Sequence, residues 1–334
     1  MSGIRHTRGK IVLFFIVTIL ATVCLTLAAI RIGGLDTTYG QLLRGLFIEY
    51  DKNVRIIFDI RLPRIVVALL GGALMAVSGL LMQAVMRNPL ADPGIIGISS
   101  GSAFASVLVT ALFPALSPIL PIFSFIGGMV AFFLVYILAW DGQITPIRLI
   151  LVGVAVNALF TGLYEAFNAM TGGSYSGAAS IINANIQYKT WDDVRTLAIY
   201  AVVAAVLCVI IAGKCNLLAL SDQTAHGLGV RVNRLRFLVS ILSVLLASIF
   251  TAIIGTISFL GLIVPHIGRL LVGSDHKVLI PYSALLGAFI FLLADTIGRS
   301  IAYPYEVSAS MIMAVIGGPV FIVLLKRSRD IYGS

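Results

Sequence analysis

The chain has 334 residues, of which 59% are apolar and only 11% are charged, and its formal net charge is +9. Soluble proteins carry about a quarter charged residues, so this composition excludes an ordinary soluble domain. The charges cluster between long uncharged runs, which indicates a polytopic membrane protein. The basic residues flank those runs and form no stripe, which argues against nucleic-acid binding.

Apolar runs in the first half of the chain predict six membrane spans. The first, residues 11–30, is too long for the core of a cleaved signal peptide. The uncharged run at 94–140 is too long for one crossing, and Ser117, Pro118 and Pro121 divide it into two spans. The remaining spans of this half are expected at residues 65–86, 149–170 and 196–213.

The second half is predicted to contain four further spans. Two segments carry the positive charge typical of the cytoplasmic side, and the chain must cross the bilayer twice between them. They are marked by Arg231, Arg234 and Arg236, and by Arg269, His276 and Lys277. The spans are expected at 237–257, at a shorter 259–272, at 278–294 and at 307–325. The sequence thus predicts an all-α polytopic membrane protein with ten transmembrane helices, both termini cytoplasmic, and a single transmembrane domain over residues 1–334.

Small residues recur at every fourth position in two of the expected spans. Such spacing lets helices approach closely in lipid, so we interpret it as a packing feature. The residues are Ala68, Gly72 and Ala76 in one span, and Gly97, Gly101 and Ala105 in the other.

The long polar interruption at residues 214–236 is the segment best suited to contact a soluble partner. Ser221 is a candidate N-cap, Asp222 suits a first helical turn, and Gly227 or Gly229 could end the helix. An ordinary solvated loop is the alternative. The apolar side of this helix is expected to consist of Leu217, Leu218, Leu220, Ala225 and Leu228.

One expected span, at 149–170, carries polar residues within about 100° of arc on one helical face. A carboxylate and amides are costly in a bilayer unless they face a cavity or a polar partner. Two interpretations stay open: a helix that lines a transport pathway, or hydrogen bonds between helices. The residues are Asn157, Thr161, Tyr164, Glu165 and Asn168.

Three arginines are expected on the outer side, where positive charge is disfavoured. Arg61 and Arg64 stand at the head of the second span, and Arg299 follows Asp295 at the end of the ninth. They are either membrane anchors or a surface that docks an acidic soluble protein.

Motifs for catalysis and metal binding are weak. Residues 97–101 match the G-x-S-x-G nucleophile pattern but open a membrane helix, so an intramembrane hydrolase is a distant hypothesis. No histidine pair has metal-ligand spacing, and no P-loop is complete. We therefore expect no catalytic residue, no metal site and no cofactor in this chain, and any ATP must be used by partner subunits.

Several motifs together resemble the signatures of FecCD/BtuC-type ABC importer permeases, the family of iron-siderophore and vitamin B12 uptake systems. They occur in the family order from Arg61 to Arg299, and the tail at 316–321 also matches. They are R-L-P-R (61–64), Q-A-V-M-R-N-P-L-A-D-P-G (83–94), F-L-G-L-I-V-P-H-I-G-R (259–269), G-S-D-H-K (273–277) and the pair Asp295/Arg299.

The resemblance implies a ten-helix permease in a bacterial cell membrane. Its partners would be a second permease subunit, identical or homologous, two cytoplasmic ATPases and an extracytoplasmic substrate-binding protein, in contact with lipid and not with nucleic acid. The helix that docks on the ATPase maps to about residues 217–229, including Gly229, with Arg231 at its rim. The binding-protein contacts map to Arg61, Arg64 and Arg299, and a cytoplasmic gate maps to Thr145, Pro146 and Ile147.

Two departures from the family pattern affect these expectations. Residues 182–186 read I-N-A-N-I where the family often has W-x-x-G-S-L, and the docking helix has Gln223 and Thr224 where an acid is usual. The expected function is a permease subunit that imports a ferric siderophore, with vitamin B12 or haem as the alternative cargo. A self-sufficient secondary transporter that uses Glu165 and Asp295 for ion coupling is the rival from another class.

Overall fold

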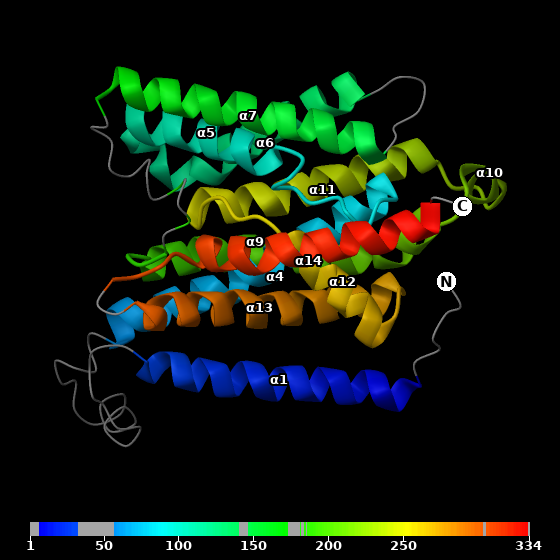
Figure 1. The fold of residues 1–334 in the computed structure, drawn as a ribbon, viewed down its shortest axis with the longest axis horizontal. Coiled ribbons are helices and arrows are strands. Elements are labelled where there is room, and N and C mark those ends of the chain that lie inside the picture. Colours follow the sequence, from blue (N-terminus) through cyan, green and yellow to red (C-terminus); the bar gives the residue numbers. More distant parts are fainter. Residues whose placement is uncertain are drawn as a thin grey trace.

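The computed structural model describes residues 7–32, 57–139, 146–172, 181, 184, 186–302 and 305–332, without the side chains of 146–147 and 324–332. Every regular element in these ranges is helical, and the helices lie roughly along one common direction (Figure 1). They are α1 (Arg8–Arg31), η1 (Ile57–Arg61), α4 (Leu62–Met86), α5 (Ile98–Leu112), η2 (Pro114–Ile119), α6 (Leu120–Ala139), α7 (Pro146–Met170), α9 (Trp191–Leu218), α10 (Asp222–Gly227), α11 (Val232–Ile253), α12 (Leu260–Val272), α13 (His276–Ile301) and α14 (Ala309–Tyr332).

Seven of the described helical stretches are long and apolar enough to cross a membrane, and three further apolar helices are shorter. The all-helical class is confirmed for the described residues. Each predicted span coincides with one helix, and the ten crossings remain a prediction because α5, α12 and the apolar part of α14 are short. The start of α1, the end of α14 and α10 lie at the same end of the bundle (Figure 1). Placing that end in the cytoplasm also remains a prediction.

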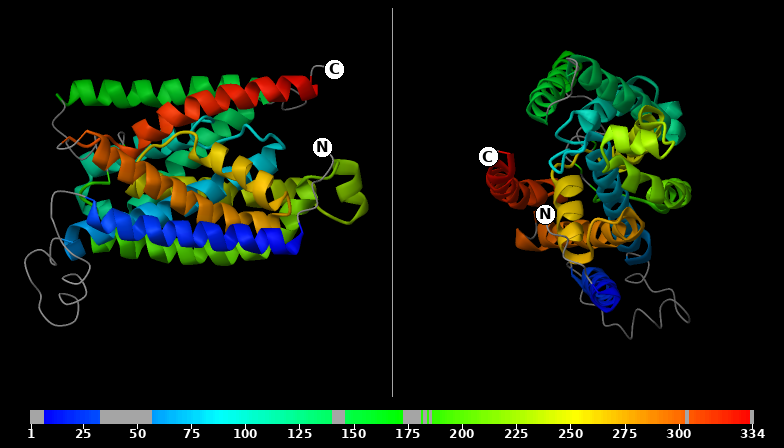
Figure 2. Two further views of the ribbon diagram at one scale, coloured as in Figure 1. Left: turned by 60° about the horizontal axis from the view of Figure 1, so that its bottom comes forward. Right: turned by 90° about the vertical axis from the view of Figure 1, so that its right-hand side faces the viewer.

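Helix α4 forms the centre of the bundle. Most of its length is buried, and α13, α11, α12 and α9 pack around it. Helices α1, α7 and α14 lie at the periphery in the end-on view (Figure 2). Helix α1 fully buries only Thr18 and Ala29, and its exposed apolar residues, such as Val12, Leu13 and Leu20, suit contact with lipid.

The predicted small-residue crossings are present. Gly72 of α4 and Gly287 of α13 are so close that a Cβ atom on either would meet the other's carbonyl oxygen. Gly101 of α5 and Gly127 of α6 make the same close approach. Because lipid provides no hydrophobic drive between helices, contact at glycine backbones supplies packing that larger residues would prevent.

Buried serines tie α11 to its neighbours. Ser78 of α4 and Ser243 of α11 each donate a hydrogen bond to the other's carbonyl oxygen, at 2.6 and 2.8 Å. Ser124 of α6 donates to the carbonyl of Ser248 at 2.8 Å, and the hydroxyls of Ser102 and Ser248 lie 2.8 Å apart. These bonds satisfy polar groups that the bilayer cannot solvate.

Candidate functional site

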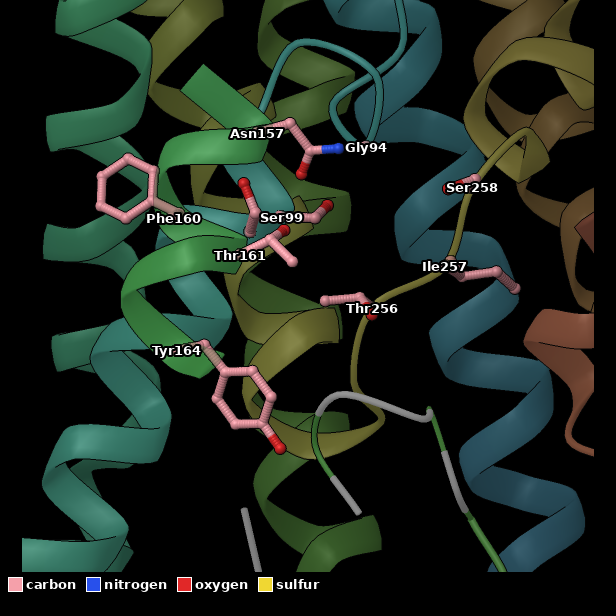
Figure 3. Close-up of a pocket in the computed structure, with 10 residues that line it drawn as sticks. Gly94, Ser99, Asn157, Phe160, Thr161, Tyr164, Thr256, Ile257 and Ser258 are labelled. Atoms are coloured by element: carbon pink, nitrogen blue, oxygen red, sulfur yellow. The ribbon is translucent and has the colours of Figure 1, made fainter. Parts of the chain in front are cut away.

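A polar cavity of about 200 Å³ lies between α5, α7 and the chain that joins α11 to α12 (Figure 3). The cavity is a candidate part of a transport pathway, because backbone and hydroxyl groups face it at membrane depth. Its lining consists of Gly94, Ser99, Ser100, Asn157, Phe160, Thr161, Tyr164, Thr256, Ile257 and Ser258.

Three of the five polar residues predicted on α7 line this cavity: Asn157, Thr161 and Tyr164. Glu165 and Asn168 are not among the lining residues, and Glu165 is exposed. With 3.6 residues per turn, Glu165 lies about 80° around the helix from Asn157, at the edge of the predicted arc. Asn168 shares the direction of Asn157 but lies three turns further along, beyond the cavity.

The opposite wall is the start of α5. Gly97 adopts φ +89° immediately before this helix, and it packs against the backbone of α7 at Asn157. The Ser99 hydroxyl is buried without a hydrogen-bond partner in the described protein, whereas Ser100 donates to the carbonyl of Gly97 at 2.8 Å. The residues that line the cavity include no carboxylate or imidazole to activate Ser99, so the G-x-S-x-G match has no catalytic setting there.

The third wall is a non-helical stretch, residues 254–259, which the sequence did not predict at this length. We expected the flanking spans to be separated only near residue 258, but α11 ends at Ile253 and α12 begins at Leu260. Gly255 has φ +116°, and the amide of Thr256 donates to the carbonyl of Ile181 at 3.0 Å. Irregular backbone is tolerated at membrane depth only where it is buried in protein or lines a cavity, and this stretch does both.

At the end of the bundle opposite α10, two of the three predicted arginines, Arg64 and Arg299, lie in an ion-pair cluster rather than on an open surface. Arg64 binds Asp295 of α13 through Nε and Nη2, at 3.1 and 2.7 Å, and its Nη1 lies 2.8 Å from Glu306. The Nε atom of Arg299 lies 3.4 Å from the same Asp295. Arg64 and Arg299 are 7% and 9% exposed, so a docking partner could reach them only in part.

Two of these arginines also hold the end of α1. Arg61 donates to the carbonyl of Ile30 at 2.8 Å, and Arg299 donates to the carbonyl of Ala29 at 3.3 Å. Cations near the C-terminus of a helix satisfy its last carbonyls and its dipole. The cluster therefore joins α1, α4 and α13, and docking of an acidic protein by these arginines stays a prediction.

At the other end, Ser221 caps α10 as predicted, because its hydroxyl accepts the amide of Thr224 at 3.2 Å. Gly229 follows the helix with φ +77°, as expected for one of the two candidate glycines. Asp222 pairs with Arg87 at 2.6 Å and with Arg236 at 2.8 Å. These contacts seat α10 against the ends of α4 and α11.

The apolar side predicted for this segment is different in the structure. Leu217 and Leu218 belong to the end of α9, and Leu218 and Ala225 are buried within the protein. Leu220 is half-buried, whereas Leu228 is 63% exposed. Leu218 and Ala225 help to fix the segment to the bundle, and Leu228 is the most exposed of the five.

The predicted gate residues lie at the boundary of the described residues. Thr145 lies outside the described residues, and Pro146 and Ile147 are seen only as the first turn of α7.

Of the residues that sequence reasoning missed, Arg87 is the clearest. It occupies the left-handed region at the end of α4 and donates to the carbonyls of Leu218 and Leu220. Its place in the R-N-P-L motif was the only sequence signal for this role.

Within the described residues, no group of three His, Cys, Asp or Glu could hold a metal.

Comparisons with known proteins agree with this architecture. The model of the FecCD transport family matches residues 19–327. A Staphylococcus aureus (strain MSSA476) protein named probable heme-iron transport system permease protein IsdF is 36% identical over 98% of both chains. A solved structure described as an inward-facing conformation of a putative metal-chelate type ABC transporter has a TM-score of 0.77 and 30% identity, and covers 95% of this chain and 99% of its own.

A more distant solved structure, PsaBC from Streptococcus pneumoniae in complex with Fab, is 17% identical with a TM-score of 0.59. It covers 86% of this chain and 95% of its own. At this identity the likeness supports the shared fold alone.

Proposed function

Because this chain belongs to the FecCD transport family, we propose that it forms the substrate pathway of an ABC importer as one of two permease subunits. It is an ABC transporter permease and a multi-pass protein of the cytoplasmic membrane. In the proposed assembly, two ATPases dock at the α10 end and a substrate-binding protein docks at the arginine end. ATP is used by the ATPases, and this chain contributes no catalytic residue.

The observation that carries this proposal is the polar cavity beside the broken backbone between α11 and α12. Polar groups line it from three sides, and they belong to neutral side chains and backbone. Weak, distributed contacts suit a pathway, because a site that binds cargo tightly would retain it. At about 200 Å³ the cavity is smaller than the roughly 300–1,000 Å³ of ligand sites, so a bulky cargo requires a second subunit to complete the route.

The cargo proposed is an iron chelate. A ferric siderophore is the cargo predicted from the sequence motifs. Haem is the second candidate, and the name of the 36% identical Staphylococcus aureus protein favours it. The neighbour described as a metal-chelate type transporter supports the broader class that contains both.

The rival secondary transporter is disfavoured by the position of its two candidate carboxylates. Asp295 is 1% exposed and is held by Arg64 and Arg299, so it is not free to take up and release an ion. Glu165 is exposed and lies outside the cavity lining. Neither residue stands in the polar cavity where an ion would have to accompany cargo.

Reconstitution in proteoliposomes tests the proposal. The permease would be combined with a partner ATPase and an extracytoplasmic binding protein, and uptake of ⁵⁵Fe-labelled siderophores and of haem would be compared. We expect uptake that needs both ATP and the binding protein. An ATPase variant that cannot hydrolyse ATP is the matched control. Uptake by the permease alone, driven by an ion gradient, would contradict the proposal.

A further inference from the structure

All three nitrogen atoms of the Arg64 guanidinium are bound to carboxylates in the observed arrangement. Its Nε and Nη2 atoms bind the two oxygens of Asp295, and its Nη1 atom binds Oε2 of Glu306 at 2.8 Å. Planar, bidentate pairing with Asp295 fixes the orientation of the guanidinium. Arg64 is also only 7% exposed, so an acidic partner that approaches it competes with the two carboxylates already bound to it.

The two carboxylates differ in how easily they can be replaced. The side chain of Asp295 is 1% exposed and also lies 3.4 Å from Arg299, so its removal would leave buried charges unpaired. The side chain of Glu306 is 33% exposed, and it is held by a bond to Arg64. Water can take over that bond at little cost, so Glu306 is the replaceable ligand.

The backbone beside Glu306 is anchored independently of this contact. The amide of Val307 donates to the carbonyl of Gly298 at 3.0 Å, and a Cβ atom on Gly298 would clash with the carbonyl of Val307. This close approach holds the segment that leads into α14 against α13. The Glu306 side chain can therefore leave Arg64 by rotation about its own bonds, without a movement of the helix.

We propose that Glu306 is a built-in substitute for a partner's carboxylate. At rest it occupies the Nη1 side of Arg64, and an acidic side chain of the extracytoplasmic binding protein displaces it during docking. This inference rests on the proposed function, since it assumes that such a protein docks at this end. Docking then exchanges one ion pair for another, which keeps the complex weak and lets the emptied binding protein leave.

The exchange is tested by the affinity of the binding protein for the complete permease–ATPase complex in lipid nanodiscs. The probe is the purified, cargo-loaded binding protein that supports uptake in the reconstituted system, and its binding is measured by biolayer interferometry. Glu306→Gln removes the competing charge and keeps the size of the side chain. We expect it to bind about two- to five-fold more tightly than the wild type, the range for a partly exposed ion pair.

Two matched variants distinguish the local contact between Glu306 and Arg64 from a general effect of negative charge at this end of the bundle. Glu306→Asp keeps the charge but shortens the reach to Arg64, so it should also tighten binding. Asp192→Asn removes one negative charge from the start of α9, at the same end of the bundle and outside the cluster, so it should leave the affinity unchanged (Figure 1). Glu306 variants are expected to fold, because Asp295 still satisfies the buried arginines.

Each result decides the matter. Tighter binding by both Glu306 variants, with unchanged Asp192→Asn, supports the exchange. Unchanged or weaker binding by Glu306→Gln overturns it, while the docking function stands because the wild type still binds. Equal tightening by Glu306→Gln and Asp192→Asn also overturns it, because long-range charge then explains both. If the wild-type complex does not bind the protein at all, the proposed function fails as well.

Discussion

Asp92 lies in the connection between α4 and α5 and is fully buried. Its Oδ1 atom accepts the amides of Gly94 at 2.8 Å and Ile95 at 3.3 Å, and its Oδ2 atom faces Gly261 at the start of α12. Burial raises the pKa of Asp92 to about 6, although the two amide bonds act in the opposite direction. The residue fixes the turn that leads to the cavity wall, and it does so with a carboxyl group that is costly to ionise.

This raised pKa predicts a pH-dependent stability. Between about pH 4 and pH 6 the folded protein binds the Asp92 proton and the unfolded chain does not, so stability falls as pH rises through this window and levels off above it. A shift of this size corresponds to roughly 3 kcal/mol. Thermal unfolding in detergent between pH 4.5 and 7.5 should show this fall in the wild type and a reduced fall in Asp92→Asn. The exposed Asp192→Asn variant is the control and should keep the wild-type slope. Equal slopes in all three proteins would show that Asp92 does not titrate in this range.

If α10 docks on the ATPase, as proposed, it can transmit a movement only if it is held by its neighbours, and the structure shows its contacts with them. Asp222 joins Arg87, at the end of the central α4, to Arg236, in the first turns of α11. Ala225 lies on the buried side of α10, whereas Leu228, which directly follows this helix, is exposed. A movement of α10 would therefore be transmitted to both α4 and α11. Helix α11 leads directly into the stretch that forms one wall of the cavity.

The exposed Leu228 gives a prediction for this element. Leu228→Asp should abolish ATP-dependent uptake, because a charge at this position cannot enter an apolar cleft of an ATPase, and the amount of protein in the membrane should stay normal. Uptake into vesicles and a membrane immunoblot measure the two effects. Gln223→Glu, which adds a charge at another exposed position of α10, should retain most of the uptake. Normal uptake by Leu228→Asp would mean that the ATPase docks elsewhere.

Local signals in the sequence predicted the elements better than their contacts. The cap at Ser221, the break at η2 and the glycine crossing at Gly72 follow from short-range rules, and all are present. The pairing of Arg64 with Glu306 joins residues 242 positions apart, which no local pattern specifies. The apolar side expected for α10 differs in the structure for a similar reason, since Leu218 belongs to α9 and the bundle itself buries both Leu218 and Ala225.

At the scale of the whole molecule, the arginine cluster lies where α4 begins and α13 ends, and α10 lies at the opposite end of the bundle (Figure 1). The cavity lies between α5, α7 and the stretch 254–259 (Figure 3). Helices α7 and α14 lie at the periphery and expose large apolar residues such as Leu151, Met311 and Val315. Lipid or a second subunit can cover these surfaces. If the cargo is an iron chelate, as proposed, the cavity of about 200 Å³ is too small for it, and the proposed route would have to widen between two subunits during transport.

The widening can be followed with cysteines on α7 in a version without Cys24, Cys208 and Cys215. Asn157→Cys and Thr161→Cys place thiols on the cavity wall, and Glu165→Cys places one on the same helix outside it. We expect a small hydrophilic thiol reagent to modify positions 157 and 161 several-fold faster while the partner ATPase hydrolyses ATP than at rest. The rate at position 165 should change less, because this side chain is exposed in either case. Inert thiols at 157 and 161 in a protein that still transports would mean that this face is packed against a neighbouring subunit. The cargo would then have to pass along another surface of the bundle.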